Sequence, residues 1–163
     1  MNLKEKIYLI ALLLFVTYMV SANYIFIVLI KVDDESSRVN LDLPEHSESV
    51  LFNIDVINED VVRWKQIITI RGWGFIAGVD TEKIEHHIIL KKDDKIFAFN
   101  TTSMIRKDVT EHYKDFSLNL DYAGFEAKIA RGVLKKGEYQ IGLLITVEAE
   151  EGYRLSDRYI EIK

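Results

Sequence analysis

The hydrophobic pattern divides the chain into one long apolar segment and a region of short apolar runs. Residues 7–30 read IYLIALLLFVTYMVSANYIFIVLI and include neither a charged residue nor a proline. As a helix, a segment of this length would extend roughly 36 Å, whereas the hydrocarbon core of a bilayer is about 30 Å thick. The pattern therefore predicts a single transmembrane helix, a signal anchor, over residues 7–30.

A cleaved signal peptide is an alternative for the same segment. Val20-Ser21-Ala22 resembles a small-residue cleavage site. Cleavage after Ala22 would leave YIFIVLI at the mature N-terminus, whereas a signal peptide usually stops being apolar at its cleavage site. A buried helix of a soluble fold is less favoured, because no face of the segment is polar. We prefer the uncleaved anchor and leave cleavage after Ala22 open.

The flanking charges predict the orientation of the anchor. Lys4 and Lys6 precede it, and a run of acidic residues follows at positions 33–35. Because positively charged flanks tend to remain in the cytoplasm, we expect residues 1–6 to be cytoplasmic. The bulk of the chain would then be extracytoplasmic, at the cell membrane of a bacterium.

Beyond the anchor, the pattern predicts a linker and then strands. Residues 31–49 are polar and include the only proline, Pro44. From Val50 on, short runs rich in β-branched and aromatic residues alternate with turn residues about every ten positions. We expect strands at residues 50–57, 65–76, 83–90, 95–99, 116–120, 124–130, 138–147 and 158–162, and one helical turn near residues 108–114.

These strands predict an all-β domain over residues 50–163, namely an immunoglobulin-like antiparallel β-sandwich. Gly137-Glu138-Tyr139, followed by an alternating strand, fits the tyrosine corner of such folds. One interpretation of Trp73, in a preceding strand, is a core aromatic residue. Gly72 and Gly74, inside a strand, predict a bulge or a close backbone approach.

The composition excludes several classes of function. The chain of 163 residues has no cysteine, which excludes disulfides, thiolate metal sites and a cysteine nucleophile. Its formal net charge is -5, and it has no long basic run. Because binding to phosphates needs clustered lysine and arginine, we expect no nucleic-acid partner.

The densest group of polar and aromatic residues is the sequence IRKDVTEHY at residues 105–113. Arg106, Asp108, His112 and Tyr113 are candidate binding residues at one end of the sandwich. The alternative, which we favour, is that Arg106 pairs with a carboxylate and ties a long crossing between strands to the sheet.

Exposed aromatic rings are a second candidate feature, because they can stack on sugar rings. Most aromatic residues of a β-sandwich belong to its core, so only one or two are expected at the surface. Trp73 is the candidate that we single out; the other aromatic residues considered are Trp64, Phe75, Tyr113, Phe116, Phe125 and Tyr153.

No pattern of residues indicates a metal or catalytic site. His86 and His87 are adjacent on an expected strand, so they should point to opposite faces and be unable to share an ion. The acidic pair Asp93-Asp94 falls in an expected turn, where carboxylates are usually solvated. No hydrolase, metalloprotease, phosphate-binding or dinucleotide motif occurs. We therefore expect no metal, no cofactor and no enzymatic activity.

Four short motifs occur together in one order: Gly72-Trp73-Gly74, Arg106-x-Asp108-Val109, Gly124-Phe125 and Gly137-x-Tyr139. In this arrangement, residues 67–147 resemble a β-sandwich domain of bacterial proteins associated with cell-surface polysaccharides and teichoic acids. The resemblance implies an accessory module at the cell envelope, and it supplies no catalytic residues. Proteins with this domain sometimes carry a glycosyltransferase or several membrane spans, which this chain does not show.

The expected function is a membrane-anchored, non-catalytic accessory or binding module in the assembly or export of surface glycans. Its partners would be the bilayer, through residues 7–30, and either a surface glycan or a membrane protein of glycan assembly. An alternative is a structural subunit or protein-interaction module of a membrane complex. An envelope hydrolase is a third and less favoured possibility, since no motif supports it.

Overall fold

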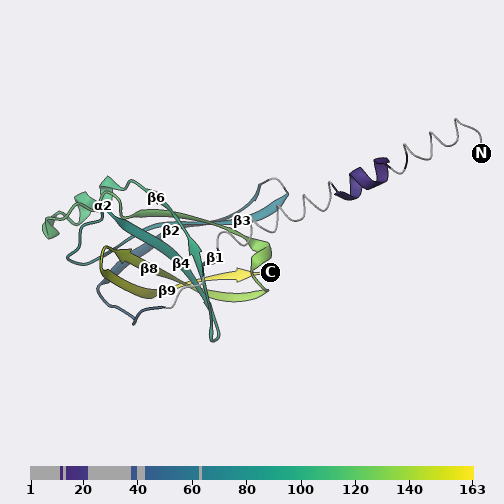
Figure 1. Ribbon diagram of the computed structural model, residues 1–163. Helices are drawn as coiled ribbons and strands as arrows, with labels where there is room; N and C mark the ends of the chain where they lie inside the picture. The colour runs from purple at the N-terminus through teal and green to yellow at the C-terminus, as the bar shows by residue number, and fades with distance from the viewer. Residues whose placement is uncertain (1–11, 13, 22–37, 40–42, 63) are drawn as a thin grey trace, which may run out of the picture. The chain divides into compact units, whose positions relative to one another are not determined.

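The computed structural model describes residues 12, 14–21, 38–39, 43–62 and 64–163, and the chain separates into two units, Met1–Ser36 and Ser37–Lys163 (Figure 1). In the first unit, Leu12 and residues 14–21 are helical, and their apolar side chains are exposed. Most of the predicted anchor, residues 1–6 and much of the predicted linker lie outside the described residues. Where the structure describes the chain, it has no helix long and apolar enough to cross a membrane.

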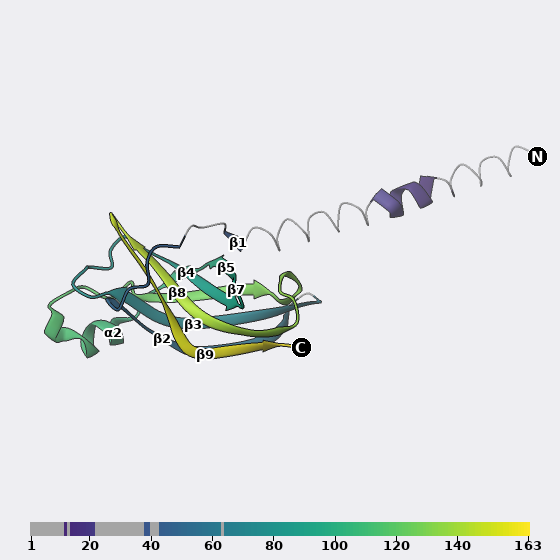
Figure 2. The same ribbon diagram turned by 90° about the horizontal axis from the view of Figure 1, so that it is seen from below.

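The second unit is a β-sandwich of two antiparallel sheets (Figures 1 and 2). One sheet has the order β1-β5-β4-β8-β9, with bounds Arg38–Val39, Lys95–Asn100, Ile84–Lys92, Gly137–Val147 and Glu150–Ile162. The other has the order β2-β3-β7-β6, with bounds Val50–Val62, Lys65–Ile76, Gly124–Ala130 and Thr102–Met104. Three short helices complete the unit: α2 at Lys107–His112, η1 at Lys114–Phe116 and η2 at Arg131–Val133.

The core consists of aliphatic and aromatic side chains that alternate along the strands and meet between the sheets. Ile68 and Ile70 of β3, Phe125 of β7, and Ile88 and Leu143 of the opposite sheet are among the side chains with no exposed surface. Because successive side chains of a strand point to opposite faces, the period of two in the sequence makes the inner face of each sheet apolar and the outer face polar.

The tyrosine corner predicted at Tyr139 is confirmed by its hydrogen bond. The Tyr139 hydroxyl donates to the Lys135 carbonyl over 2.9 Å, and the ring is fully buried at the start of β8. Because the ring reaches back over the preceding turn, it fixes the path by which the chain enters this central strand.

The prediction of a close backbone approach at Gly72 is also confirmed. A Cβ atom added there would lie 2.1 Å from the Asn53 carbonyl oxygen and 2.9 Å from the Phe125 ring. At Gly74, the added atom would meet the Leu143 side chain of the opposite sheet. Both positions therefore face the interior and have no room for a side chain.

Trp73 packs against the core but is only partly buried, so its interpretation as a core aromatic residue is confirmed only in part. Its neighbours Gly72 and Gly74 face the interior, so Trp73 points to the outer face of its sheet. There it is half-buried, at ring-centroid distances of 6.0 Å from Phe75 and 5.5 Å from Tyr113. The loop after β6 covers this face, so an outward residue of the strand still has apolar neighbours.

A strand predicted at residues 116–120 is also absent. Phe116 ends η1, and residues 117–120 form a loop across the domain. The backbone amides of Asn119 and Leu120 bond to the side chains of Asp80 and Thr110 instead of a neighbouring strand. Leu120 is fully buried although it belongs to this loop. The alternation of apolar and polar residues at 116–120 therefore reflects which side chains are buried, and it does not indicate strand pairing.

Candidate functional site: a groove between strands β2 and β9

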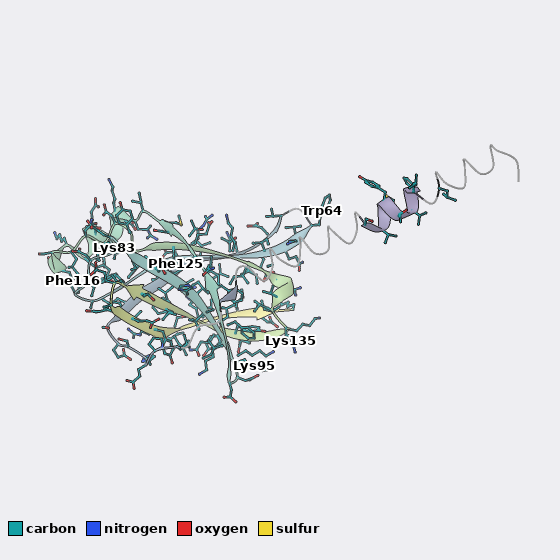
Figure 3. All side chains as sticks on the ribbon, in the orientation of Figure 1. Trp64, Lys83, Lys95, Phe116, Phe125 and Lys135 are labelled. Atoms are coloured by element: carbon teal, nitrogen blue, oxygen red, sulfur yellow. The ribbon has the colours of Figure 1, made fainter. Side chains whose placement is uncertain are left out.

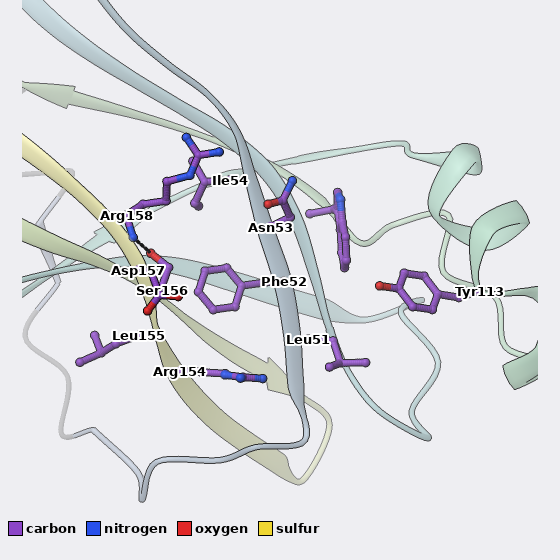
Figure 4. Close-up of a pocket in the computed structure, with 11 residues that line it drawn as sticks. Leu51, Phe52, Asn53, Ile54, Tyr113, Arg154, Leu155, Ser156, Asp157 and Arg158 are labelled. Atoms are coloured by element: carbon purple, nitrogen blue, oxygen red, sulfur yellow. Dashed lines mark hydrogen bonds between the residues drawn. The ribbon is translucent and has the colours of Figure 1, made fainter.

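A groove of about 440 Å³ opens between two edge strands that belong to different sheets (Figure 4). On one side lies β2, with Tyr113 beyond it, and on the other lies β9. The lining residues are Leu51, Phe52, Asn53, Ile54, Trp73, Tyr113, Arg154, Leu155, Ser156, Asp157 and Arg158. Concave sites with apolar walls and a few polar groups are typical of ligand-binding surfaces.

Both edge strands are irregular where they border this groove. The register of β2 against β3 shifts between Ile54 and Val56, which leaves Asp55 as an extra residue. The register of β9 against β8 shifts so that Tyr159 pairs with Gln140 but Leu155 pairs with Gly142. Residues 156–158 are thus the bulge of β9. Bulges at sheet edges bend the strand and redirect its side chains, and they often border functional sites.

Ser156 holds the bulge of β9 in place. Its hydroxyl donates to the Ile141 carbonyl over 2.8 Å and accepts a hydrogen bond from the Arg158 backbone amide over 3.1 Å. Gln140 donates through its side-chain amide to the Ser156 carbonyl over 2.8 Å. Arg158 follows directly from this bulge, and its side chain lines the groove together with Ile54 of β2 (Figure 4).

The two arginines of the groove have different surroundings. Arg154 donates to the Val50 carbonyl over 3.3 Å, and its Nη2 atom lies 3.3 Å from a Glu48 carboxylate oxygen. Arg154 therefore links the two edge strands. Within the described residues, no carboxylate lies in ion-pair distance of the Arg158 guanidinium. Arg158 is exposed and available to a ligand.

An aromatic cluster contributes two of the residues that line the groove. The Trp73, Phe75, Tyr113 and Phe116 rings pack with centroid distances between 5.1 and 6.2 Å. Phe75 is fully buried beneath the others, while Trp73 and Tyr113 are half-buried and line the groove. Because α2 and η1 carry Tyr113 and Phe116 at their ends, the loop that covers the outer face also completes this cluster, which we call the aromatic wall.

Arg106 connects this loop to the bulge of β2. Its Nε and Nη2 atoms donate to both carboxylate oxygens of Asp108 over 2.8 and 2.6 Å, and its Nη1 atom lies 2.5 Å from Asp55 Oδ2. The Asp108 hydrogen bond, with Asp55, raises the pKa of Arg106 above its ordinary value. The Arg106 hydrogen bond holds the pKa of Asp108 below its ordinary value. The predicted pairing of Arg106 with a carboxylate is confirmed.

The structure separates the five predicted binding residues into two groups. Trp73 and Tyr113 line the groove. Arg106 and Asp108 lie behind it as a pair, although Asn53 in the groove donates to Asp55 over 2.7 Å and so touches the same network. His112 is exposed, with its ring edge against Tyr113, and does not line the groove. Any binding role of these residues remains a prediction.

The arginines of β9 were not found by sequence reasoning, because the last strand was expected to begin only at Arg158. The structure extends that strand back to Glu150. Ser156, Asp157 and Arg158 are three consecutive polar residues that interrupt an otherwise alternating pattern. Such an interruption inside a strand is the sequence signal of a bulge, and it could have identified this edge.

The prediction that His86 and His87 point to opposite faces is confirmed. His86 is buried between the sheets, where its Nε2 atom lies 2.9 Å from the Gly74 carbonyl oxygen. Burial lowers the pKa of His86 to about 4. His87 is half-buried on the other side, and its Nδ1 atom is buried without a hydrogen-bond partner. Among the described residues, no three His, Cys, Asp or Glu side chains are grouped so as to hold a metal ion.

Comparison of the chain with protein-family models, with curated proteins and with solved structures found no match.

Proposed function

We propose that this protein is a membrane-anchored, non-catalytic binding module that holds an anionic surface glycan in the groove between β2 and β9. In this proposal, residues 7–30 attach the chain to the cell membrane of a bacterium, and the β-sandwich is extracytoplasmic. The module would serve as an accessory to the assembly or export of the glycan.

The strand order supports an immunoglobulin-like architecture for the domain. The order β2-β3-β7-β6 matches strands A, B, E and D of that fold, and β5-β4-β8-β9 matches strands C′, C, F and G. The tyrosine corner then falls at the start of strand F, as the fold requires. Domains of this architecture are common as cell-surface modules, and they bind through their edges and end loops.

The observation that carries the proposal is that half-buried aromatic rings and a guanidinium without an ion-pair partner in the described part of the chain line one groove. Arg158 has no carboxylate partner among the described residues, and Trp73 and Tyr113 line the same groove. A guanidinium binds carboxylate or phosphate oxygens through two parallel hydrogen bonds. Aromatic rings offer flat apolar surfaces on which the C–H faces of sugar rings can lie. Together they suit a glycan that carries acidic groups.

The lining also supports binding without hydrolysis. Among the lining residues, Asp157 is the one carboxylate, whereas glycosidases place two carboxyl groups on either side of the scissile bond. Asn53 and Ser156 supply polar groups, but both are already engaged in hydrogen bonds that hold the edge strands. These features suit a surface that retains a ligand.

Titration calorimetry on the full-length protein in detergent micelles tests this proposal. The probes are a purified polyanionic wall polysaccharide and a neutral polysaccharide of similar size. We expect only the anionic probe to bind. Arg158→Gln should reduce the affinity for this probe by about tenfold or more, since a hydrogen bond to a charged group contributes about 1.5–3 kcal/mol. Lys95→Gln removes the same formal charge at the exposed first residue of β5 and should leave affinity unchanged.

A second pair of variants tests the aromatic wall. Trp73→Ala should reduce the affinity for the anionic probe about tenfold. Trp64→Ala, at a tryptophan that does not line the groove, should leave this affinity unchanged. Because Trp73 packs on Phe75, the melting temperature of each variant must be compared with that of the parent protein. Failure of the parent protein to bind the anionic probe, or equal binding by Arg158→Gln and the parent, would refute the proposed site.

A further inference from the structure

The hairpin of β2 and β3 ends in a turn whose described apolar residues lie outside the buried core. Val62 pairs with Lys65 across a tight turn that includes Trp64. The pairing of β3 with β7 ends at Ile67, so the hairpin continues beyond β7 by two residues, or roughly 7 Å at about 3.4 Å per residue. Trp64 lies at the end of this projection (Figure 3).

The side chains of the tip are unusually exposed for their type. The exposed fraction is 88% for Trp64, 71% for Val61 and 53% for Val62. A single exposed apolar residue needs no explanation, but a tryptophan and two valines gathered at the end of a projecting hairpin form an apolar wedge in water. We call Val61, Val62 and Trp64 the apolar tip.

The backbone of the tip is strained. Trp64 has a φ of 69°, in the left-handed region that two-residue hairpin turns require and that glycine or asparagine usually occupies. A bulky residue is costly there, and natural proteins tend to retain such costs at functional positions. The turn places Trp64 at the end of the hairpin (Figure 3).

The charges near the tip differ from those at the opposite end of the sandwich. Arg131 donates to Gln66 at the base of the tip, and Lys135 and Lys136 follow in the turn before β8. Lys135 lies at the same end of the domain as Trp64 (Figure 3). Glu59 and Asp60 precede the tip on β2. This end of the domain therefore carries charges of both signs, and its cations lie in the turns next to the hairpin.

The far end of the same strands is acidic. Exposed Glu148 lies in the turn that joins β8 to β9, and exposed Glu150 and Glu151 begin β9. Glu148 is paired with Lys83 over 3.5 Å, so Glu150 and Glu151 supply the net negative charge of this group. An anionic surface would therefore attract the end with the tip and repel the other end.

We propose that the apolar tip inserts into the headgroup region of an anionic phospholipid bilayer and thereby orients the domain on the membrane. Tryptophan is enriched at the interface between headgroups and acyl chains, where its ring is apolar and its N–H group stays hydrated. The valines enter beside it, and Arg131, Lys135 and Lys136 face lipid phosphates. The inference rests on the proposed attachment through residues 7–30, which keeps a bilayer within reach.

The same geometry links the tip to the groove. The groove between β2 and β9 is bordered by the same strand, β2, whose far end forms the tip. Fixing the tip in the headgroups would hold β2, and with it the groove, at a constant angle to the membrane. The occupant of the groove would then be presented to membrane enzymes in one orientation.

The two tryptophans allow a direct test with an internal control. Trp73→Phe leaves Trp64 as the reporter, and Trp64→Phe leaves Trp73. Each full-length variant is reconstituted into phosphatidylglycerol-containing vesicles whose acyl chains are brominated near the headgroup, and flotation measures attachment. We expect bromine to quench Trp64 about twofold or more relative to Trp73, and more strongly in anionic than in zwitterionic vesicles.

The chain lacks cysteine, so a spin label provides a second measurement that does not depend on Trp73. Trp64→Cys and, as the matched control, Tyr159→Cys place labels at the tip and at an exposed position of β9. The label at position 64 should become accessible to oxygen and protected from a water-soluble nickel complex on vesicles. The label at position 159 should remain accessible to the nickel complex.

Three results would overturn the inference, and they differ from failure of the glycan-binding proposal, which is tested in micelles. Protein that does not float with vesicles would refute both the attachment and the tip. Protein that floats while Trp64 stays unquenched would refute the tip alone. Protection of Trp64 from iodide in detergent, increasing with protein concentration, would show that a second copy of the chain covers the tip instead of lipid.

Discussion

Asp55 and Arg106, which are far apart in the sequence, meet at the back of the groove. The Nη1 atom of Arg106 lies 2.5 Å from Oδ2 of Asp55, and the two side chains are 25% and 30% exposed. Asp55 is the extra residue in the bulge of β2, and Arg106 begins the loop that carries Tyr113. One ion pair therefore couples the irregular edge strand to the aromatic wall.

We expect Arg106→Ala to reduce the free energy of unfolding by about 1–3 kcal/mol, because it leaves Asp55 partly buried without its cation and releases Asp108. Arg106→Lys should recover little of this, since an ammonium group cannot replace the planar fork that binds both Asp108 oxygens. Urea denaturation measures the change. Lys107→Ala, at the exposed neighbouring position, is the control, and equal stability of the two alanine variants would contradict the role of this ion pair.

His86 should make stability depend on pH. Its pKa is about 4 in the folded protein, because burial disfavours the charged ring, and about 6.5 when unfolded. Between these values the unfolded state binds a proton that the folded state does not, so stability increases with pH. The contribution is complete above pH 6.5 and lost as the pH falls toward 4, and it amounts to roughly 3 kcal/mol.

Urea denaturation between pH 4 and 8 measures this effect, and His86→Gln should flatten the curve while its amide still donates to the Gly74 carbonyl. His112→Gln, at an exposed position on α2, should leave the curve unchanged. Asp108 and Glu126 also have lowered pKa values. Their contributions to stability are lost only as the pH falls below the ordinary carboxyl pKa of about 4. A parent protein whose stability is constant between pH 4.5 and 6.5 would contradict the assignment to His86.

Much of the fold follows from local pattern in the sequence. Period-two alternation identified β3, β7 and β8, and the spacing Gly137-x-Tyr139 located the tyrosine corner whose hydrogen bond the structure contains. These features depend on residues close together in the sequence. The absent strand at 116–120 shows the limit, because alternation records which side chains are buried and not whether a strand or a loop buries them.

Less of the groove could be predicted, because its two sides come from strands of different sheets. Trp73 and Tyr113 were singled out as aromatic residues in polar surroundings, but nothing local to β2 indicates that β9 lies opposite. The guanidinium of Arg158 reaches the groove only because a bulge redirects it. The register of edge strands depends on tertiary contacts, which a single sequence does not reveal.

Gly72 offers a test of the close approach between β3 and β2. We expect Gly72→Ala to destabilise the domain by about 2–4 kcal/mol, because its Cβ atom would overlap the Asn53 backbone and force β2 away from β3. Gly132→Ala is the matched control, since an added Cβ atom there meets no neighbouring atom within 4 Å. Thermal denaturation compares the two. A Gly72→Ala protein as stable as Gly132→Ala would show that the edge strand yields freely.

Ser156 tests whether the bulge of β9 positions Arg158. Ser156→Ala removes the hydroxyl that bonds the Ile141 carbonyl and the Arg158 amide, so the bulge should relax and the guanidinium should lose its fixed direction. We expect affinity for the anionic polysaccharide to fall about three- to tenfold, with a loss of about 1 kcal/mol in stability. Ser103→Ala, on the exposed strand β6, is the control. If Ser156 acts through Arg158, its substitution should have little further effect in an Arg158→Gln background, because the group that it positions is already absent. Calorimetric affinities that fall by the full factor in both backgrounds would show that Ser156 contacts the ligand itself.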